Sequence, residues 1–252
     1  RGADLVLTVT EQDRQALLAD VPDLEVRLAS NIHDPVPDAP APDSAERRDL
    51  VFVGNFNHPP NGDAMVWFCG EVFPRITAVL PDVKLYIVGN MPTPEVERLA
   101  GPNVAVTGYV PSTLPYLQRC RLSIAPLRYG AGMKGKVGEA LAAGIPVVTT
   151  AAGAEGMGLE DGRHALIADG ADAFAEAVIR LYRDEQLRAR LAAEGRRLIA
   201  ARYGSGTVGR QWRDTLERAR EIKTQKTQGQ GRMTNGQCSM TNKRQGGMTN
   251  DQ

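Results

Sequence analysis

The sequence has little cysteine, no net charge and no long apolar run. Each of these absences excludes some classes of protein. Its cysteines are Cys69, Cys120 and Cys238, an odd number without a CxxC pair, so we expect no disulfide framework and a reducing, cytoplasmic setting. Peripheral attachment to a membrane is the alternative location. No apolar run approaches the roughly 18 to 20 residues of a membrane span, so we expect no transmembrane segment.

The balance of charges also excludes a class of function. Thirty Lys and Arg residues match thirty Asp and Glu residues, which argues against a generally basic nucleic-acid binder. No cluster of Asp, Glu or His has the spacing of metal ligands, so the sequence pattern itself indicates no metal site. Hydrophobic residues make up 42% and charged residues 24%, which is typical of a globular protein.

The zero net charge conceals an uneven distribution along the chain. Residues 1–49 carry 5 basic and 11 acidic side chains, whereas residues 221–252 carry 5 basic and 2 acidic ones. Residues 101–150 hold five basic side chains and one acid, Glu139. Such a segment can arise by chance, but it also fits a bound anion.

Apolar runs that alternate with helical patterns predict the fold. A strand, a helix and a strand are expected before residue 30, and a run with four prolines follows. Continuous apolar runs, each followed by a helix, predict a Rossmann-like parallel sheet with helices on both faces. Ligands of such sheets bind beyond the carboxyl ends of the strands. The expected strands of this sheet span residues 49–53, 83–88, 104–107, 122–125, 146–150 and 165–168.

A glycine-rich loop over residues 126–135 carries the features of an anion site. It joins an expected strand to an expected helix, whose free N–H groups and dipole favour a phosphate. Gly130, Gly132 and Gly135 match GxGxxG of dinucleotide-binding proteins, and residues 130–136 match GxxxxGK of a P-loop. The P-loop needs Ser or Thr where Val137 stands, and the dinucleotide fingerprint belongs after the first strand. A glycine turn without a ligand is a further alternative.

Several short motifs stand in a fixed order along the chain. They are Phe52-Val53-Gly54, Ile87-Val88-Gly89, Val106-Thr107-Gly108, Glu139-Ala140, Gly144-Ile145-Pro146-Val147-Val148 and Ala152-Gly153-Ala154-Glu155-Gly156. Over roughly residues 49–203 they resemble the donor-binding half of family 4 glycosyltransferases, which are retaining enzymes of the GT-B fold. Residues 125–150 resemble the family's donor signature, and Asn31-Ile32-His33-Asp34 loosely resembles its interdomain linker. The resemblance implies no obligatory metal and no cofactor besides the nucleotide-sugar substrate.

The resemblance implies roles for individual residues. Glu139 matches the family's glutamate that binds the ribose hydroxyls of a nucleotide sugar, although a glutamate here could also merely stabilise the helix dipole. Lys136 and Glu139 are the expected catalytic residues. The expected donor nucleotide and phosphate site comprises Gly54, Asn55, Gly108, Tyr109, Val110, Arg128, Gly130, Gly132, Lys134, Lys136 and Glu139.

The sequence departs from the family at two positions. A second glutamate that contacts the donor sugar in many members is replaced by Ala131. The loop over residues 54–62 lacks the Arg and the Lys that grip the diphosphate in most members. We expect Lys134 or Lys136, helped by Arg128, to replace them.

The resemblance and the composition together suggest five segments. Residues 1–30 are a remnant of an acceptor domain, 31–48 a proline-rich linker, 49–204 the donor-binding domain, 205–222 a C-terminal helix and 223–252 a disordered low-complexity tail. The chain lacks an initiator Met and opens on a strand pattern, so we expect a piece of a longer protein whose missing N-terminal domain binds the acceptor glycan.

The expected function is transfer of a sugar from a nucleotide-diphosphate sugar to an acceptor with retention, in polysaccharide or glycoconjugate synthesis. We expect this fragment alone to be inactive. Two alternatives stay open, a nucleotide-sugar-binding module without catalysis and an NAD-type dinucleotide-binding domain.

Overall fold

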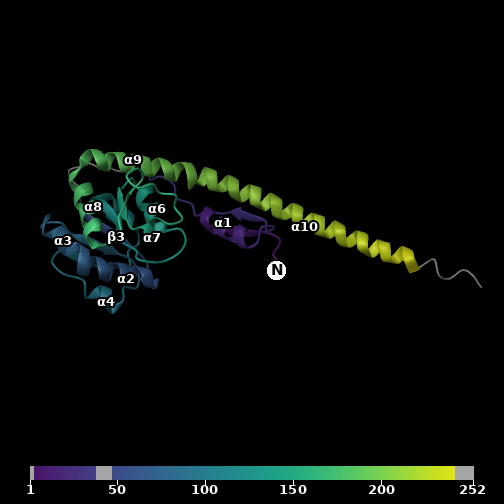
Figure 1. Ribbon diagram of the computed structural model, residues 1–252, viewed down its shortest axis with the longest axis horizontal. Coiled ribbons are helices and arrows are strands. Elements are labelled where there is room, and N and C mark those ends of the chain that lie inside the picture. The colour runs from purple at the N-terminus through teal and green to yellow at the C-terminus, as the bar shows by residue number, and fades with distance from the viewer. Residues whose placement is uncertain (1–2, 38–46, 242–252) are drawn as a thin grey trace, which may run out of the picture.

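The computed structural model of the protein describes residues 3–37 and 47–241. It contains a small N-terminal unit, a larger α/β domain and a long C-terminal helix, and this helix leaves the domain and passes beside the small unit (Figure 1).

The N-terminal unit is a strand, a helix and a strand, as the sequence predicts. Strands β1 (Val6–Thr8) and β2 (Val26–Leu28) pair in parallel, and α1 (Glu11–Asp20) connects them. The helix begins at Thr10, whose side-chain oxygen accepts a hydrogen bond from the N–H of Asp13 at 3.0 Å. This bond satisfies one of the free N–H groups of the first turn.

The larger domain is built on a six-stranded parallel sheet in the order β5-β4-β3-β6-β7-β8, which confirms the predicted fold class. From β3 the chain moves outward to β4 and β5, and it then returns to the other side of β3 to form β6. The strand order therefore reverses between β3 and β6, and that is where such sheets bind ligands. The strands are β3 (Arg48–Val53), β4 (Leu85–Val88), β5 (Val104–Gly108), β6 (Cys120–Ala125), β7 (Val147–Thr149) and β8 (Leu166–Ile167).

Helices cover both faces of this sheet because its strands are apolar on both sides. Leu50 and Phe52 of β3 belong to a core cluster that includes Phe174, whereas Val51 between them belongs to a second cluster with Leu141. Alternate residues of a strand point to opposite faces, so each cluster fills one face. The covering helices are α2 (Pro59–Trp67), α3 (Phe73–Thr77), α4 (Pro94–Glu97), α5 (Leu114–Arg119), α6 (Gly135–Ala142), α7 (Ala151–Ala154), α8 (Ala171–Arg183) and α9 (Glu185–Arg202).

One expected helix is interrupted in the structure. The sequence predicts a continuous helix over residues 60–79, but a π-helical turn over Phe68–Val72 separates α2 from α3. Pro74 lies in the first turn of α3 and has no N–H to donate to the preceding turn. The regular ladder of hydrogen bonds therefore changes register there.

Helix α10 spans Ser205–Thr241, which includes the expected helix over residues 205–222 and the first part of the expected tail. Residues 242–252 of the predicted tail lie outside the described residues. Arg218 of α10 binds the N-terminal unit through Glu25, with Nε–Oε1 at 2.7 Å and Nη2–Oε2 at 2.8 Å. Arg218, helped by Arg27, lowers the pKa of Glu25 to about 2.

The start of the expected linker is packed against the larger domain. The N–H of His33 donates to the carbonyl of Tyr203, and that of Val36 donates to the carbonyl of Ala142 at the end of α6, both at 2.9 Å. The Asp34 carboxylate accepts from the N–H of Ser205 at 2.7 Å. Residues 31–37 are therefore fixed to the domain, and residues 38–46 of the predicted linker lie outside the described residues.

The His33 ring accounts for a glycine inside α6. A Cβ atom placed on Gly138 would lie 2.7 Å from Cδ2 and Nε2 of His33. Glycine in a helix interior costs about 1 kcal/mol relative to alanine. The close packing of the imidazole therefore explains why a poor helix former stands at this position.

We expect Gly138→Ala to lower the free energy of unfolding by about 1–2 kcal/mol, because the added methyl group overpacks the contact with His33. In a His33→Ala background the same change should raise it by about 1 kcal/mol, because only the helix propensity then changes. Urea denaturation of the four variants measures both effects. Equal destabilisation in the two backgrounds would show that His33 does not exclude a side chain here.

Candidate functional site

A cavity of about 340 Å³ lies at the carboxyl ends of β3 and β6, where the strand order reverses. Its walls come from the loop after β3, the start of α2, the glycine-rich loop and the start of α6. Six of the predicted site residues line it, namely Gly54, Asn55, Gly130, Lys134, Lys136 and Glu139. The other lining residues are Val53, His58, Pro60, Asn61, Leu127, Tyr129, Ala131, Met133 and Gly135.

The glycine-rich loop is shaped by positive φ angles and by a lysine. Gly130 has φ 119° and Gly132 has φ 78°, values that side chains other than glycine rarely adopt. The Lys134 ammonium donates to the carbonyls of Gly130 at 2.8 Å and Gly132 at 2.6 Å. Only 8% of its side chain is exposed. Lys134 therefore holds the loop in shape, and its charge is already engaged by the main chain.

Lys136 differs from Lys134 in its surroundings. Its Nζ donates to Oδ1 of Asn61 and lies 4.6 Å from the centre of the Phe52 ring. Burial, and to a smaller degree the positive charge of Lys134, lower the pKa of Lys136 to about 7. A bound anion would favour the charged form of this amine. Lys136 is therefore suited to bind an anionic group in the cavity.

Asn61 orients the lysine amine. Its Nδ2 donates to the carbonyl of Asn55 at 2.6 Å, which leaves Oδ1 to accept from Lys136. The asparagine is 8% exposed and stands in the first turn of α2, next to Gly54. The loop after β3 is thus linked to α6 through a single amide.

Glu139 faces the cavity from the second turn of α6. Its Oε1 accepts a hydrogen bond from the hydroxyl of Thr113, which precedes α5. The carboxylate also acts on His33, because its negative charge raises the pKa of that imidazole while burial, the larger effect, lowers it. Glu139 is half-buried, so its carboxylate can reach a ligand in the cavity.

Five predicted site residues do not line this cavity. Arg128 forms an ion pair with Asp63 of α2, with Nε–Oδ2 at 2.8 Å, and this carboxylate raises the pKa of Arg128. Its charge is therefore balanced within the protein, which spacing in the sequence could not reveal. The others are Gly132, Gly108, Tyr109 and Val110. The loop of the last three ends at Thr113, whose hydroxyl contacts Glu139, and Tyr109 itself is 72% exposed.

Sequence reasoning missed several residues of the site. Asn61, Phe52 and Thr113 contact the predicted residues directly, yet each occurs in an ordinary helix or strand pattern. The one signal is the position of Asn61, in the first turn of a helix that follows a strand of the sheet. His58 lines the cavity and is exposed at the N-cap of α2.

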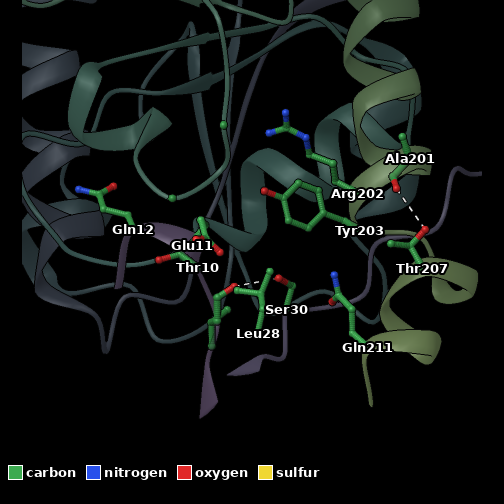
Figure 2. Close-up of a pocket in the computed structure, with 13 residues that line it drawn as sticks. Thr10, Glu11, Gln12, Leu28, Ser30, Ala201, Arg202, Tyr203, Thr207 and Gln211 are labelled. Carbon is green, nitrogen blue, oxygen red and sulfur yellow. Dashed lines mark hydrogen bonds between the residues drawn. The ribbon is translucent and has the colours of Figure 1, made fainter. Parts of the chain in front are cut away.

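A second cavity, of about 530 Å³, lies between the N-terminal unit and the junction of α9 with α10 (Figure 2). Several of its polar groups bind the main chain. Tyr203 donates to the carbonyl of Met157 at 3.0 Å, Ser30 to that of Val9 at 2.9 Å and Thr207 to that of Ala201 at 3.1 Å. Its lining lacks the glycine-rich loop and the buried lysines of the first cavity, so the first cavity is the stronger candidate.

Within residues 3–37 and 47–241, no three or more His, Cys, Asp or Glu side chains gather where they could hold a metal ion. No helix in this part of the chain is both long and apolar enough to cross a membrane.

Comparison with known proteins places the larger domain in a family. Residues 47–184 match the family described as glycosyl transferases group 1. A protein of the cps region of Klebsiella pneumoniae is 30% identical over 141 residues, which are 52% of this chain and 36% of that protein. Phosphatidyl-myo-inositol mannosyltransferase of Mycolicibacterium smegmatis is 30% identical over 161 residues, or 60% of this chain and 41% of the relative. The chain thus spans about two fifths of the length of these relatives.

Solved structures share the fold at low sequence identity. TarM of S. aureus, in a complex with UDP, superimposes with a TM-score of 0.68 at 16% identity, over 84% of this chain and 43% of that one. Anabaena HepE in complex with UDP gives a TM-score of 0.68 at 17% identity, over 85% of this chain and 64% of that one. The architecture is therefore the Rossmann-like half of a GT-B fold, and the match over more than half of the sequence shows that the chain belongs to the glycosyl transferases group 1 family.

Proposed function

We propose that this chain is the donor-binding part of a retaining family 4 glycosyltransferase, which transfers a sugar from a nucleotide-diphosphate sugar to an acceptor. One observation carries the proposal. Lys136 and Glu139, a half-buried lysine and a half-buried carboxylate, both line a cavity at the switch point of the sheet and stand on one helix. A cation and an acceptor group on one wall match the diphosphate and the ribose hydroxyls of such a donor.

The side chains would divide the work between them. Glu139 accepts hydrogen bonds from ribose hydroxyls, and Lys136 with the N-terminal N–H groups of α6 binds the diphosphate. When the bond to the sugar breaks, negative charge grows on the departing diphosphate. Cations and N–H groups fixed beforehand stabilise that charge more in the transition state than in the ground state. Retention and independence from metals are what the family resemblance implies.

Uridine diphosphate is the first donor nucleotide to test. The TarM and HepE structures are complexes with UDP, and both share the fold of this domain. The relatives are a phosphatidyl-myo-inositol mannosyltransferase and a protein of a cps region, which favours a glycan or a glycolipid as acceptor. We propose that a further N-terminal domain binds this acceptor. A cytoplasmic location, with or without peripheral membrane attachment, fits such substrates.

The alternative of a binding module without catalysis rests on Ala131. This residue lines the cavity, at the position where many family members carry a glutamate against the donor sugar. A methyl group cannot accept hydrogen bonds from a sugar. The domain could therefore bind the nucleotide while placing the sugar poorly.

We expect residues 1–252 to bind a nucleoside diphosphate but to transfer no sugar, and a longer chain with the N-terminal domain to do both. Turnover of a radiolabelled nucleotide sugar by the two proteins measures this. Binding without transfer by the longer chain would favour the module without catalysis. Transfer by residues 1–252 alone would contradict the need for an acceptor domain.

We expect Lys136→Ala to weaken binding of uridine diphosphate by about 10- to 100-fold, because hydrogen bonds to charged groups contribute about 1.5–3 kcal/mol. Arg128→Ala is the matched control, since this cation is already paired with Asp63 and should change the affinity little. Calorimetric titration with uridine, thymidine and guanosine diphosphates and with NAD gives the affinities. Tightest binding of NAD would favour the dinucleotide-binding domain, and an unchanged affinity of Lys136→Ala would remove the lysine from the site.

The affinity for the diphosphate should also depend on pH through Lys136. In the free protein its pKa is about 7, and a bound diphosphate raises it. Binding therefore takes up a proton above about pH 7, so the affinity should fall by up to about tenfold per pH unit until the pKa of the complex is reached. Titrations between about pH 7 and pH 9 measure this slope. In Lys136→Arg the guanidinium stays charged and the slope should disappear; the same slope in both proteins would assign it to another group.

A further inference from the structure

We propose that Thr113 is a positioning residue that fixes the Glu139 carboxylate for the ribose and so makes the site selective for ribonucleotides over 2′-deoxyribonucleotides. This inference rests on the proposed function, because it assigns a partner to the carboxylate that binds the ribose. The contact joins residues 26 positions apart, from the loop after β5 and from α6.

The use that Thr113 makes of its hydroxyl is unusual for its position. It is the N-cap residue of α5, where a threonine side chain usually accepts a hydrogen bond from an N–H of the first turn. In the described structure that side chain does not cap α5. Its Oγ1 instead donates to Oε1 of Glu139. A cap costs about 1 kcal/mol when it is lost, so this bond takes the place of a stabilising local contact.

The neighbouring serine frees Thr113 for this contact. The N–H of Leu114, the first residue of α5, lies 3.3 Å from Oγ of Ser112. The Ser112 hydroxyl therefore accepts a hydrogen bond at the start of the helix, and the Thr113 hydroxyl donates to the Glu139 carboxylate. The backbone of Thr113 has φ −79° and ψ −21°, which is helical and not the extended conformation of an ordinary N-cap.

The hydrogen bond fixes which atoms of Glu139 remain for a ligand. An ionised carboxylate offers about four lone-pair positions, and Thr113 uses one of them on Oε1. Oε2 and the remaining position on Oε1 stay available to two neighbouring hydroxyl groups, which is the pattern of a ribose. Behind the helix, the His33 ring packs on Gly138 and limits movement of this turn. The carboxylate is thus oriented before the ligand arrives, which lowers the entropy cost of binding.

The same contact links two parts of the proposed nucleotide site. Gly108, Tyr109 and Val110, which are expected to contact the base, belong to the loop that ends at Thr113. The loop itself is held by other contacts, namely the hydrogen bond from the N–H of Gly89 to the carbonyl of Gly108 at 3.2 Å and the packing of Val110 against the second core cluster. The bond from Thr113 therefore adds the orientation of Glu139 and not the placement of the loop. Loss of the hydroxyl should weaken recognition of the ribose hydroxyls specifically.

Calorimetric titration with uridine diphosphate and 2′-deoxyuridine diphosphate tests the proposal. We expect Thr113→Val to weaken binding of uridine diphosphate by about five- to twentyfold and that of the deoxy compound by less than about twofold, because the hydrogen bond supports only the carboxylate that reads the hydroxyls. Thr113→Ser keeps the hydroxyl and should retain the wild-type preference for the ribonucleotide. In a Glu139→Ala background, which lacks the acceptor of the hydrogen bond, Thr113→Val should have no further effect on this preference.

The outcomes separate this inference from the proposed function. Suppose that the wild type binds the nucleotide through Lys136 and Glu139 but that Thr113→Val keeps the wild-type preference for the ribonucleotide. This result overturns the role of Thr113 and leaves the proposed function standing. Equal weakening of both ligands, or failure of Thr113→Ser to restore the preference at an unchanged melting temperature, also overturns the role of Thr113. Absence of nucleoside diphosphate binding by the wild type overturns the proposed function and this inference with it. If guanosine diphosphate binds the wild type more tightly than uridine diphosphate does, the same titrations are made with guanosine diphosphate and 2′-deoxyguanosine diphosphate.

Discussion

The arrangement of the site depends on one buried amine. Lys136 lies against the Phe52 ring and the Asn61 amide, and the charge that acts on it is another cation, Lys134. Such a group is costly to keep charged, which is why its pKa falls so far. An anion in the cavity relieves that cost. The neighbouring Arg128 illustrates the opposite case, since Asp63 already satisfies it and no ligand is needed.

The rest of the loop supports this amine at some cost to the protein. Gly130 and Gly132 adopt conformations that side chains oppose, and the Lys134 ammonium is used to hold their carbonyls. Glycines lose more conformational entropy on folding than other residues do. At the two glycines the loop backbone runs close to the cavity, next to the start of α6, whose first residues Gly135 and Lys136 also line it. That geometry suits a phosphate group.

Much of the fold and half of the site could be predicted because the signals are local. Apolar runs followed by helical patterns gave the parallel sheet, and the position of Glu139 and Lys136 at the start of a helix after a glycine loop placed them at the strand ends. The sequence did not predict the contacts between side chains that lie far apart along the chain. The bond of Asn61 with Lys136 spans 75 residues and that of Arg128 with Asp63 spans 65, and neither has a trace in spacing or composition.

Helix α6 is where these distant contacts meet. Lys136 connects it to the loop after β3, Glu139 connects it to the loop after β5, and Gly138 receives the His33 ring. At its far end the Ala142 carbonyl accepts from Val36, so the segment that leads from the N-terminal unit is fixed along the same helix. A helix of this length has few residues on each face, and in α6 the side chains of different faces make different contacts. Gly138, where alanine would be the better helix former, follows from the contact with His33 and not from helix stability.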